Sequence, residues 1–412
     1  LLKTKAIKQT DESYKISGQK IFITSGDHDL TENIIHLVLA RAEDSPAGTK
    51  GISLFLVPKF IVKDDGTIGP RNGISTGSIE TKMGIKGSAT CVLNFDEATG
   101  YMIGPENKGL SSMFTMMNLE RIVVGIQGLG ISETAYQNAL AYAKERRQGK
   151  ANNSKNGETD LIIKHADIRR SLMNMKSLIE GQRSLAFWVS QQVDVSLNHS
   201  DKKIKSNADE IVSLMTPVIK SFFTDIGMEI TNDAIQVFGG YGYTKDQGIE
   251  QLFRDNRITP IYEGTNSVQA IDLVYRKILN NKIFEKYISQ LNEEIKDYEK
   301  NKNLELFVQK FQKYLELLNN FTSWISEKDK ISKDDVSAAC NDYLKVFGYV
   351  SLAHSWLKIL KVSYEKFDQN KNFFEDKINT ATYYFDKILP RAQSHYLSAI
   401  TGSNGLMKTK FN

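Results

Sequence analysis

The sequence predicts an α+β protein with a small antiparallel β-barrel domain, an antiparallel four-helix bundle and a further C-terminal helical domain. Three observations support this prediction. Residues 1–103 hold short apolar runs separated by turn residues, as small β domains do. In residues 104–280 the apolar spacing changes to steps of three and four, which is typical of amphipathic helices. Residues 281–412 keep this helical spacing and are rich in charge.

The barrel prediction depends on strand-like runs that end in turn signals. Residues 34–40 and 52–57 are rich in Ile, Leu, Val and Phe, and Pro58 follows the second run. The triplets at 64–66 (DDG) and 71–73 (RNG) are typical of tight turns. Short strands linked by such turns fit a small antiparallel barrel.

The bundle prediction depends on two long apolar stripes. The first consists of Ile168, Leu172, Met175 and Ile179. The second consists of Ile211, Met215, Val218, Phe222, Ile226 and Ile230. Steps of three and four place each set on one helical face. Pro217 lies inside the second stripe and predicts a kink or a break, because proline cannot donate the helical hydrogen bond.

The C-terminal domain is predicted from two further stripes that are rich in aromatic residues. One consists of Phe307, Phe311, Tyr314, Leu318, Phe321 and Ile325. The other consists of Tyr343, Phe347, Val350, His354 and Leu357. Such stripes more often form a core than a ligand pocket. We therefore expect a helical extension without chemistry of its own, in which His354 is a hydrogen-bonded core histidine.

Composition excludes several classes of protein. A net charge of +4 with interleaved acidic and basic residues gives no reason to expect a nucleic-acid partner. Cys91 and Cys340 lie far apart without metal-ligand spacing, so two buried or inert thiols and no metal site are expected. No apolar run reaches the length of a membrane span, and none is expected.

The most informative segment is residues 253–265, FRDNRITPIYEGT. It places the carboxylate of Glu263 between Tyr262 and Gly264. Glycine has no Cβ, so a ligand can approach the backbone closely at that position. A carboxylate beside such a gap is placed to accept a proton. On these residues alone, a helix N-cap or a solvated loop acid is the more economical interpretation.

The wider sequence changes this interpretation. Residues 233–243 (DAIQVFGGYGY) precede the Glu263 segment, and the two together resemble the C-terminal domain of the acyl-CoA dehydrogenase family. Residues 18–26 (GQKIFITSG) resemble the flavin-facing strand of that family. Residues 119–125 (LERIVVG) and 142–149 (YAKERRQG) resemble the two ends of its first long C-terminal helix. The chain is most similar to the subgroup with a long helical C-terminal extension.

The resemblance implies FAD-dependent α,β-dehydrogenation of an acyl-CoA thioester to the 2-enoyl-CoA. A glutamate base removes the α-proton, and the β-hydrogen leaves as hydride to flavin N5. Glu263 matches the base of the family, and its own N–H would bind the thioester oxygen. Glu120 is the rival, because some members carry the base just before an arginine of the first bundle helix. Plainer interpretations of Glu120 are a structural acid paired with Arg121 and an exposed helix residue.

The resemblance also implies the binding residues. For the substrate these are Arg121, Tyr262 and Gly264. For FAD they are Phe22, Thr24, Arg146, Gln148, Gln236, Gly239, Gly240 and Thr265. Those at 146, 148, 236, 239 and 240 match positions that reach the FAD of a neighbouring subunit. Plainer interpretations are an amphipathic strand for Phe22, a charged helix end for Arg146, and a helix C-cap for the glycine pair.

Partners and context follow from the same resemblance. We expect an electron-transfer flavoprotein as electron acceptor and a homodimer or homotetramer. The alternatives are an acyl-CoA oxidase on the same fold and a non-catalytic helical binding or assembly protein. Members of the family have an N-terminal helical domain and a flavin-binding loop before the point where this chain begins. We therefore expect a fragment, inactive by itself, of a bacterial cytoplasmic enzyme, with a mitochondrial location as the alternative.

Overall fold

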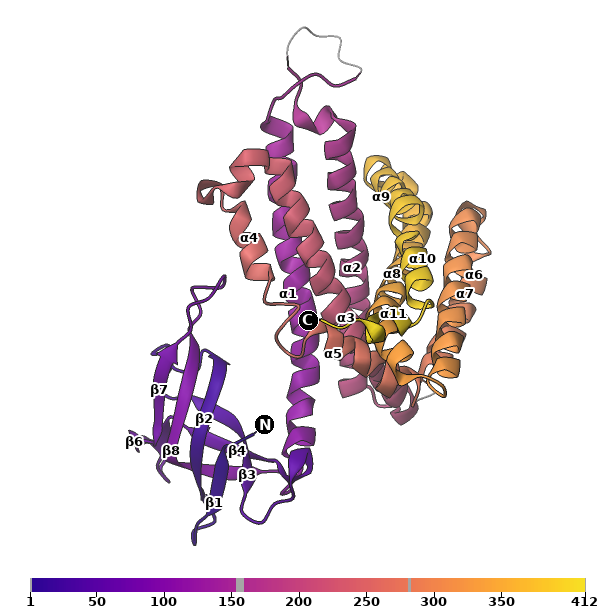
Figure 1. The fold of residues 1–412 in the computed structure, drawn as a ribbon. Coiled ribbons are helices and arrows are strands. Elements are labelled where there is room, and N and C mark those ends of the chain that lie inside the picture. The colour runs from indigo at the N-terminus through magenta and orange to yellow at the C-terminus, as the bar shows by residue number, and fades with distance from the viewer. Residues whose placement is uncertain (1, 153–158, 281–282, 412) are drawn as a thin grey trace. The chain divides into compact units, whose positions relative to one another are not determined.

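The computed structural model describes residues 2–152, 159–280 and 283–411, and it confirms the α+β class. Strands dominate the first hundred residues and helices the rest (Figure 1). The chain divides into two compact units, Leu1–Leu119 and Glu120–Asn412. Each unit has its own hydrophobic core.

The first unit holds a closed sheet. In order around the sheet its strands are β2 (Tyr14–Thr24), β1 (Lys5–Lys8), β3 (Ile35–Ala42), β4 (Ser53–Pro58) and β8 (Thr90–Ile103), with β7 (Ile74–Ile79) on the far side of β8. A further pairing of β2 with β8 closes the barrel. The predicted runs at 34–40 and 52–57 are thus β3 and β4.

Two details differ from a simple antiparallel meander. Strand β1 runs parallel to β3 where Lys5 pairs with Arg41 and Ala6 with Ala42, so the barrel is not wholly antiparallel. Strands β5 (Phe60–Val62) and β6 (Ile68–Arg71) form a separate hairpin around the predicted 64–66 turn. The barrel interior is filled by alternate side chains such as Ile16, Val38, Phe55, Val57 and Leu93.

The second unit contains the bundle. Its long helices are α1 (Gly109–Glu145), which begins in the first unit, α2 (Ala166–Asn198) and α3 (Lys202–Phe238). A shorter fourth member consists of α5 (Asn266–Ile271) continued by a π-helical segment (Asp272–Ile278), and α4 (Ile249–Asn256) precedes it. Both predicted stripes face the core of this unit.

Helix α3 continues through Pro217, so the predicted break is wrong. Pro217 is buried in the middle of a 37-residue helix whose apolar face packs on both neighbours. Tertiary packing of this extent outweighs the loss of one backbone hydrogen bond. Gly125 of α1 allows the close packing, since a Cβ there would lie 2.7 Å from the carbonyl oxygen of Ile219 in α3.

The extension is helical, as predicted. It comprises α6 (Ile283–Tyr298), α7 (Glu305–Lys328), α8 (Lys333–Glu365), α9 (Lys371–Tyr383), a π-helical turn (Tyr384–Ile388), α10 (Arg391–Ala399) and α11 (Asn404–Lys408). All residues of its two aromatic stripes are buried. They form one continuous core with the bundle, where Trp356 Nε1 donates a 3.1 Å hydrogen bond to the Ser177 carbonyl of α2.

Two other sequence predictions can be compared with the structure. Cys91 and Cys340 are buried free thiols, as expected. One segment, Lys202–Tyr243, is long and apolar enough to cross a membrane, since an 18-residue window within it has a mean hydropathy of 1.3. Of that window 72% is buried, and the core helix of a globular bundle has the same properties. It is therefore weak evidence for a membrane span.

Candidate active site

Glu263 lies in a tight loop between α4 and α5, and its backbone is strained. Its φ is +54°, and that of Gly264 is +85°. The left-handed conformation costs a residue with a side chain about 1–2 kcal/mol. Such strain persists only where the surroundings enforce it, and it occurs preferentially at functional sites. The unusual backbone therefore marks Glu263 as more than an ordinary loop acid.

The surroundings hold the loop through the carbonyl of Glu263. Arg121 Nε of α1 donates to this oxygen over 3.3 Å, and Gln269 Nε2 of α5 donates over 3.2 Å. Glycine is favoured at position 264 because its φ is +85°, and a Cβ there would also lie 2.8 Å from Gln269 Nε2. Tyr262 is fixed by its hydroxyl, which donates to Gln127 Oε1 of α1.

These contacts leave the reactive groups of Glu263 available. Among the residues that the structure describes, no acceptor is recorded for the Glu263 N–H and no donor for its carboxylate. The side chain is half-buried. An unpaired backbone donor beside an unpaired carboxylate can bind a carbonyl oxygen and receive a proton from the adjacent carbon.

The local charges make this carboxylate a better base. Burial raises the pKa of Glu263, and the nearby carboxylate of Glu120 raises this pKa further. The cations of Arg121 and Lys220 act in the opposite direction. A general base works best with a pKa near the operating pH, so a raised glutamate pKa suits proton abstraction. Glu120 itself is exposed on α1.

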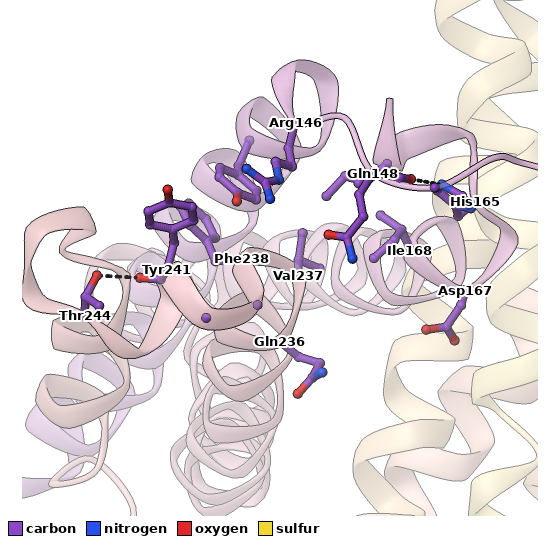
Figure 2. Close-up of a pocket in the computed structure, with 15 residues that line it drawn as sticks. Arg146, Gln148, His165, Asp167, Ile168, Gln236, Val237, Phe238, Tyr241 and Thr244 are labelled. Carbon is purple, nitrogen blue, oxygen red and sulfur yellow. Dashed lines mark hydrogen bonds between the residues drawn. The ribbon is translucent and has the colours of Figure 1, made fainter. Parts of the chain in front are cut away.

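A second cluster lies at the other end of the bundle, around the ends of α1 and α3 (Figure 2). Its pocket has a volume of about 810 Å³ and includes five predicted FAD-contacting residues: Arg146, Gln148, Gln236, Gly239 and Gly240. These residues come from two segments that lie 90 positions apart in sequence. Their convergence was expected from the resemblance alone.

The pocket has the chemistry to bind the adenosine and pyrophosphate half of a dinucleotide. The Arg146 guanidinium lies 5.7 Å from the centre of the Tyr241 ring, and its forked donors suit phosphate oxygens. Tyr142 and Phe238 stack with ring centres 4.2 Å apart and line an apolar wall. A Cβ at Gly239 or Gly240 would meet no atom within 4 Å, so backbone is open to a ligand there.

Thr265, Phe22 and Thr24 complete the predicted set. Thr265 follows the loop of Glu263 and caps α5, its hydroxyl accepting from the N–H of Val268. Phe22 belongs to the first unit, in the β2 segment where the β2–β8 register shifts, and it is 68% exposed with φ at +59°. Thr24 is exposed at the end of the same strand. An exposed aromatic on a strained backbone is consistent with a stacking role.

Sequence reasoning missed the residues that support the loop. Lys220, Asn266 and Gln269 are all buried beneath it. A lysine inside the apolar run at 216–223 (TPVIKSFF) is the one signal that pointed to an unusual site. Gln127 and Gln269 carried no signal, because amides at such positions are common.

Comparisons with known protein families match nearly the whole chain. The family description "Acyl-CoA dehydrogenase, middle domain" matches residues 1–98. "Acyl-CoA dehydrogenase, C-terminal domain" matches residues 107–279. "Acetyl-CoA dehydrogenase C-terminal like" matches residues 291–410. The three matches follow the order of the barrel, the bundle and the extension.

Individual relatives agree with these matches. A 3-methylmercaptopropionyl-CoA dehydrogenase of Ruegeria pomeroyi is 44% identical over 67% of this chain and 47% of the relative. A butyryl-CoA dehydrogenase of Syntrophomonas wolfei is 34% identical over 92% of this chain and 64% of the relative. The chain therefore spans about half to two thirds of the length of these relatives.

A solved structure reproduces the fold. The acyl-CoA dehydrogenase of Bacillus anthracis complexed with FAD superposes with a TM-score of 0.76. The match covers 98% of this chain and 67% of that one, with 19% sequence identity. The match shows that the fold of this chain is already known.

Proposed function

The chain belongs to the acyl-CoA dehydrogenase family, and from this premise we propose that the full-length protein oxidises an acyl-CoA to its 2-enoyl-CoA. FAD is the proposed cofactor. The observation that supports this proposal best is the Glu263 loop, where a strained backbone presents an unpaired carboxylate of raised pKa beside an unpaired N–H.

Glu263 removes the α-proton in this proposal. The α-carbon of a thioester is a weak acid, so the charge that develops on the thioester oxygen must be stabilised. The Glu263 N–H is a preorganised donor for that oxygen, and such a donor lowers the activation free energy by about 3 kcal/mol. Gly264 leaves space for the thioester, and Arg121 and Gln269 keep the loop from relaxing. FAD, when bound, supplies the acceptor for the β-hydrogen.

The two clusters support an oligomer. Arg121 of α1 holds the loop of Glu263. Arg146 lines the other pocket and lies 25 positions later, directly after the end of α1. At 1.5 Å per helical residue this is about 38 Å, more than one dinucleotide spans. We propose that each chain contributes Glu263 to one FAD and the Arg146 pocket to the FAD of its partner, within a homodimer or homotetramer.

The substrate is proposed to be a short acyl-CoA, because relatives carry the names butyryl-CoA and 3-methylmercaptopropionyl-CoA dehydrogenase. The test is anaerobic titration of the full-length protein with these two thioesters. Loss of the oxidised flavin absorbance is the expected result. A protein that stays colourless after addition of FAD would contradict the proposal and favour a binding protein. Peroxide release in air would favour an oxidase over transfer to an electron-transfer flavoprotein.

The pocket has a separate test that does not use catalysis. Arg146→Lys keeps the positive charge but loses the forked pair of donors. Lysine therefore cannot replace arginine at a pyrophosphate without loss. We expect FAD to dissociate about tenfold more readily, measured by flavin release on dialysis. Arg169→Lys is the matched control, since Arg169 lies on α2 outside the pocket of Arg146. Equal FAD retention in both variants would contradict the assignment.

A further inference from the structure

Beneath the loop of Glu263 lies a lysine that is entirely enclosed. Lys220 of α3 is 0% exposed, and its Nζ donates a 2.9 Å hydrogen bond to Asn266 Oδ1. The Lys220 ammonium forms no salt bridge with a described residue. A buried cation without a close counter-ion is unfavourable, and it usually survives where it serves a purpose. If this side chain only filled space, an uncharged methionine would do so without the cost of burying a charge.

Asn266 connects this lysine to the loop. Its backbone N–H donates to the Pro260 carbonyl over 3.0 Å and so closes the turn that contains Glu263. Its side-chain Nδ2 donates to Asp225 Oδ1 over 2.7 Å and to Thr224 Oγ1 over 3.0 Å. The side-chain amide of Asn266 thus links the loop to α3, and the Lys220 ammonium holds the oxygen of this amide.

The same lysine acts on the charge of the base. The cations of Lys220 and Arg121 lower the pKa of Glu263, and the anion of Glu120 raises it. Burial lowers the pKa of Lys220 to about 8, so the side chain remains largely protonated at neutral pH. Asp225, Arg121 and Glu263 are the charged groups whose electrostatic effect reaches Lys220.

We propose that Lys220 is a positioning residue for the Glu263 base: it fixes Asn266 under the loop, and its charge keeps the carboxylate ionised when substrate binds. This inference rests on the proposed function, since it gives a role to a residue behind the proposed base. The opposing groups set a balance. Burial and Glu120 favour the protonated acid, whereas Lys220 and Arg121 favour the carboxylate that can accept a proton.

The test uses the full-length flavoenzyme and measures anaerobic flavin bleaching by butyryl-CoA across the acid and neutral pH range. Lys220→Gln removes the charge and retains N–H donors for Asn266. We expect the acid limb of its rate profile to move to higher pH, because loss of an attracting cation raises the pKa of the Glu263 carboxylate. Lys220→Met is the second variant, and it should show the same shift with a lower maximal rate.

Two further variants separate charge from structure. Glu120→Gln combined with Lys220→Gln removes one repelling and one attracting charge, so the limb should return toward that of the wild type. Lys345→Met is the matched control, because Lys345 acts on Asp225 but not on Glu263. Its limb should stay at the wild-type position.

The outcomes distinguish this inference from the proposed function. If the wild type is bleached but the limb is unmoved in both lysine variants, the lysine is only structural and the inference is wrong. A limb that moves in Lys345→Met as well would also overturn it, because the effect would then be general. If no acyl-CoA bleaches the wild type, the proposed function itself fails.

Discussion

Two glutamates of the second unit occupy opposite environments. Glu263 lies in the strained loop of the bundle, where no donor to its carboxylate is recorded among the described residues, and its pKa is raised. Glu294 lies in α6 of the extension and accepts from His354, Tyr298 and Gln290. Burial opposes its ionisation, but the His354 and Gln290 donors and the Lys358 cation lower its pKa.

The difference shows what separates a reactive acid from a structural one. Both carboxylates are partly buried and both have cations nearby, so burial alone does not assign a role. Donors to the carboxylate stabilise its charge and make Glu294 a poor base. The donors around Glu263 hold its carbonyl instead, which fixes the loop and leaves the carboxylate basic. The polar contacts of Glu294 stabilise the fold of the extension, whereas those under the loop fix the position of Glu263.

The largest expected effect is in the loop. In Gly264→Ala the added Cβ meets Gln269 Nε2 at 2.8 Å, and alanine disfavours a φ of +85°. A small displacement of a reacting group costs about 100-fold in rate, so flavin bleaching by butyryl-CoA should slow by about that factor. Gly405→Ala is the matched control, because a Cβ there meets no atom within 4 Å. Equal bleaching rates in Gly264→Ala and Gly405→Ala would contradict the account, because the loop would then be no more sensitive than the extension.

The next effect is on stability. His354→Leu removes the 2.8 Å donor of the partly buried Glu294 carboxylate, and losing a hydrogen bond to a charged group costs about 2 kcal/mol. The free energy of unfolding, from urea denaturation, should fall by that amount while bleaching per bound flavin stays unchanged. His395→Leu removes the more exposed pair with Asp342 and should cost about 1 kcal/mol or less. A loss of bleaching in His354→Leu would show that the extension takes part in chemistry.

The pH dependence of stability should be opposite for the two acids. The folded pKa of Glu294 lies below the usual 4.5, so its stabilisation is complete above pH 4.5 and is lost as the pH falls below that value. Burial also lowers the pKa of His354 below 6.5, so protonation in the unfolded chain adds to acid instability below that pH. Glu294→Gln should therefore be less stable than the wild type near neutral pH, with a deficit that shrinks in acid.

The smallest effect concerns Glu263. Its folded pKa is raised, so the ionised group destabilises the fold above that pKa and does not do so below the usual 4.5. Glu263→Gln should increase the free energy of unfolding by about 1 kcal/mol or less at neutral pH. The gain should vanish in acid. A loss of stability at neutral pH would mean that the carboxylate is structural, like that of Glu294.

The sequence predicts these two regions to different depths. The spacing of Phe311, Phe321 and Tyr343 identifies the core of the extension, because helical periodicity determines which faces are buried. The run at 253–265 singles out Glu263 as the candidate base, because its order resembles that of a family. The sequence shows Lys220 as an unusual residue inside an apolar run but not its proposed role, since its partner Asn266 is 46 positions away and only the tertiary fold brings them together. Pro217 predicts a kink or a break, and the break does not occur because packing along α3 outweighs a local preference.

The most direct test of the whole account is the anaerobic reaction of the Glu263→Gln holoenzyme with butyryl-CoA. We predict that the variant retains FAD and binds the thioester, while the oxidised flavin band bleaches at least about 100-fold more slowly than in the wild type. Bleaching at the wild-type rate would contradict the account and transfer the role of the base to Glu120.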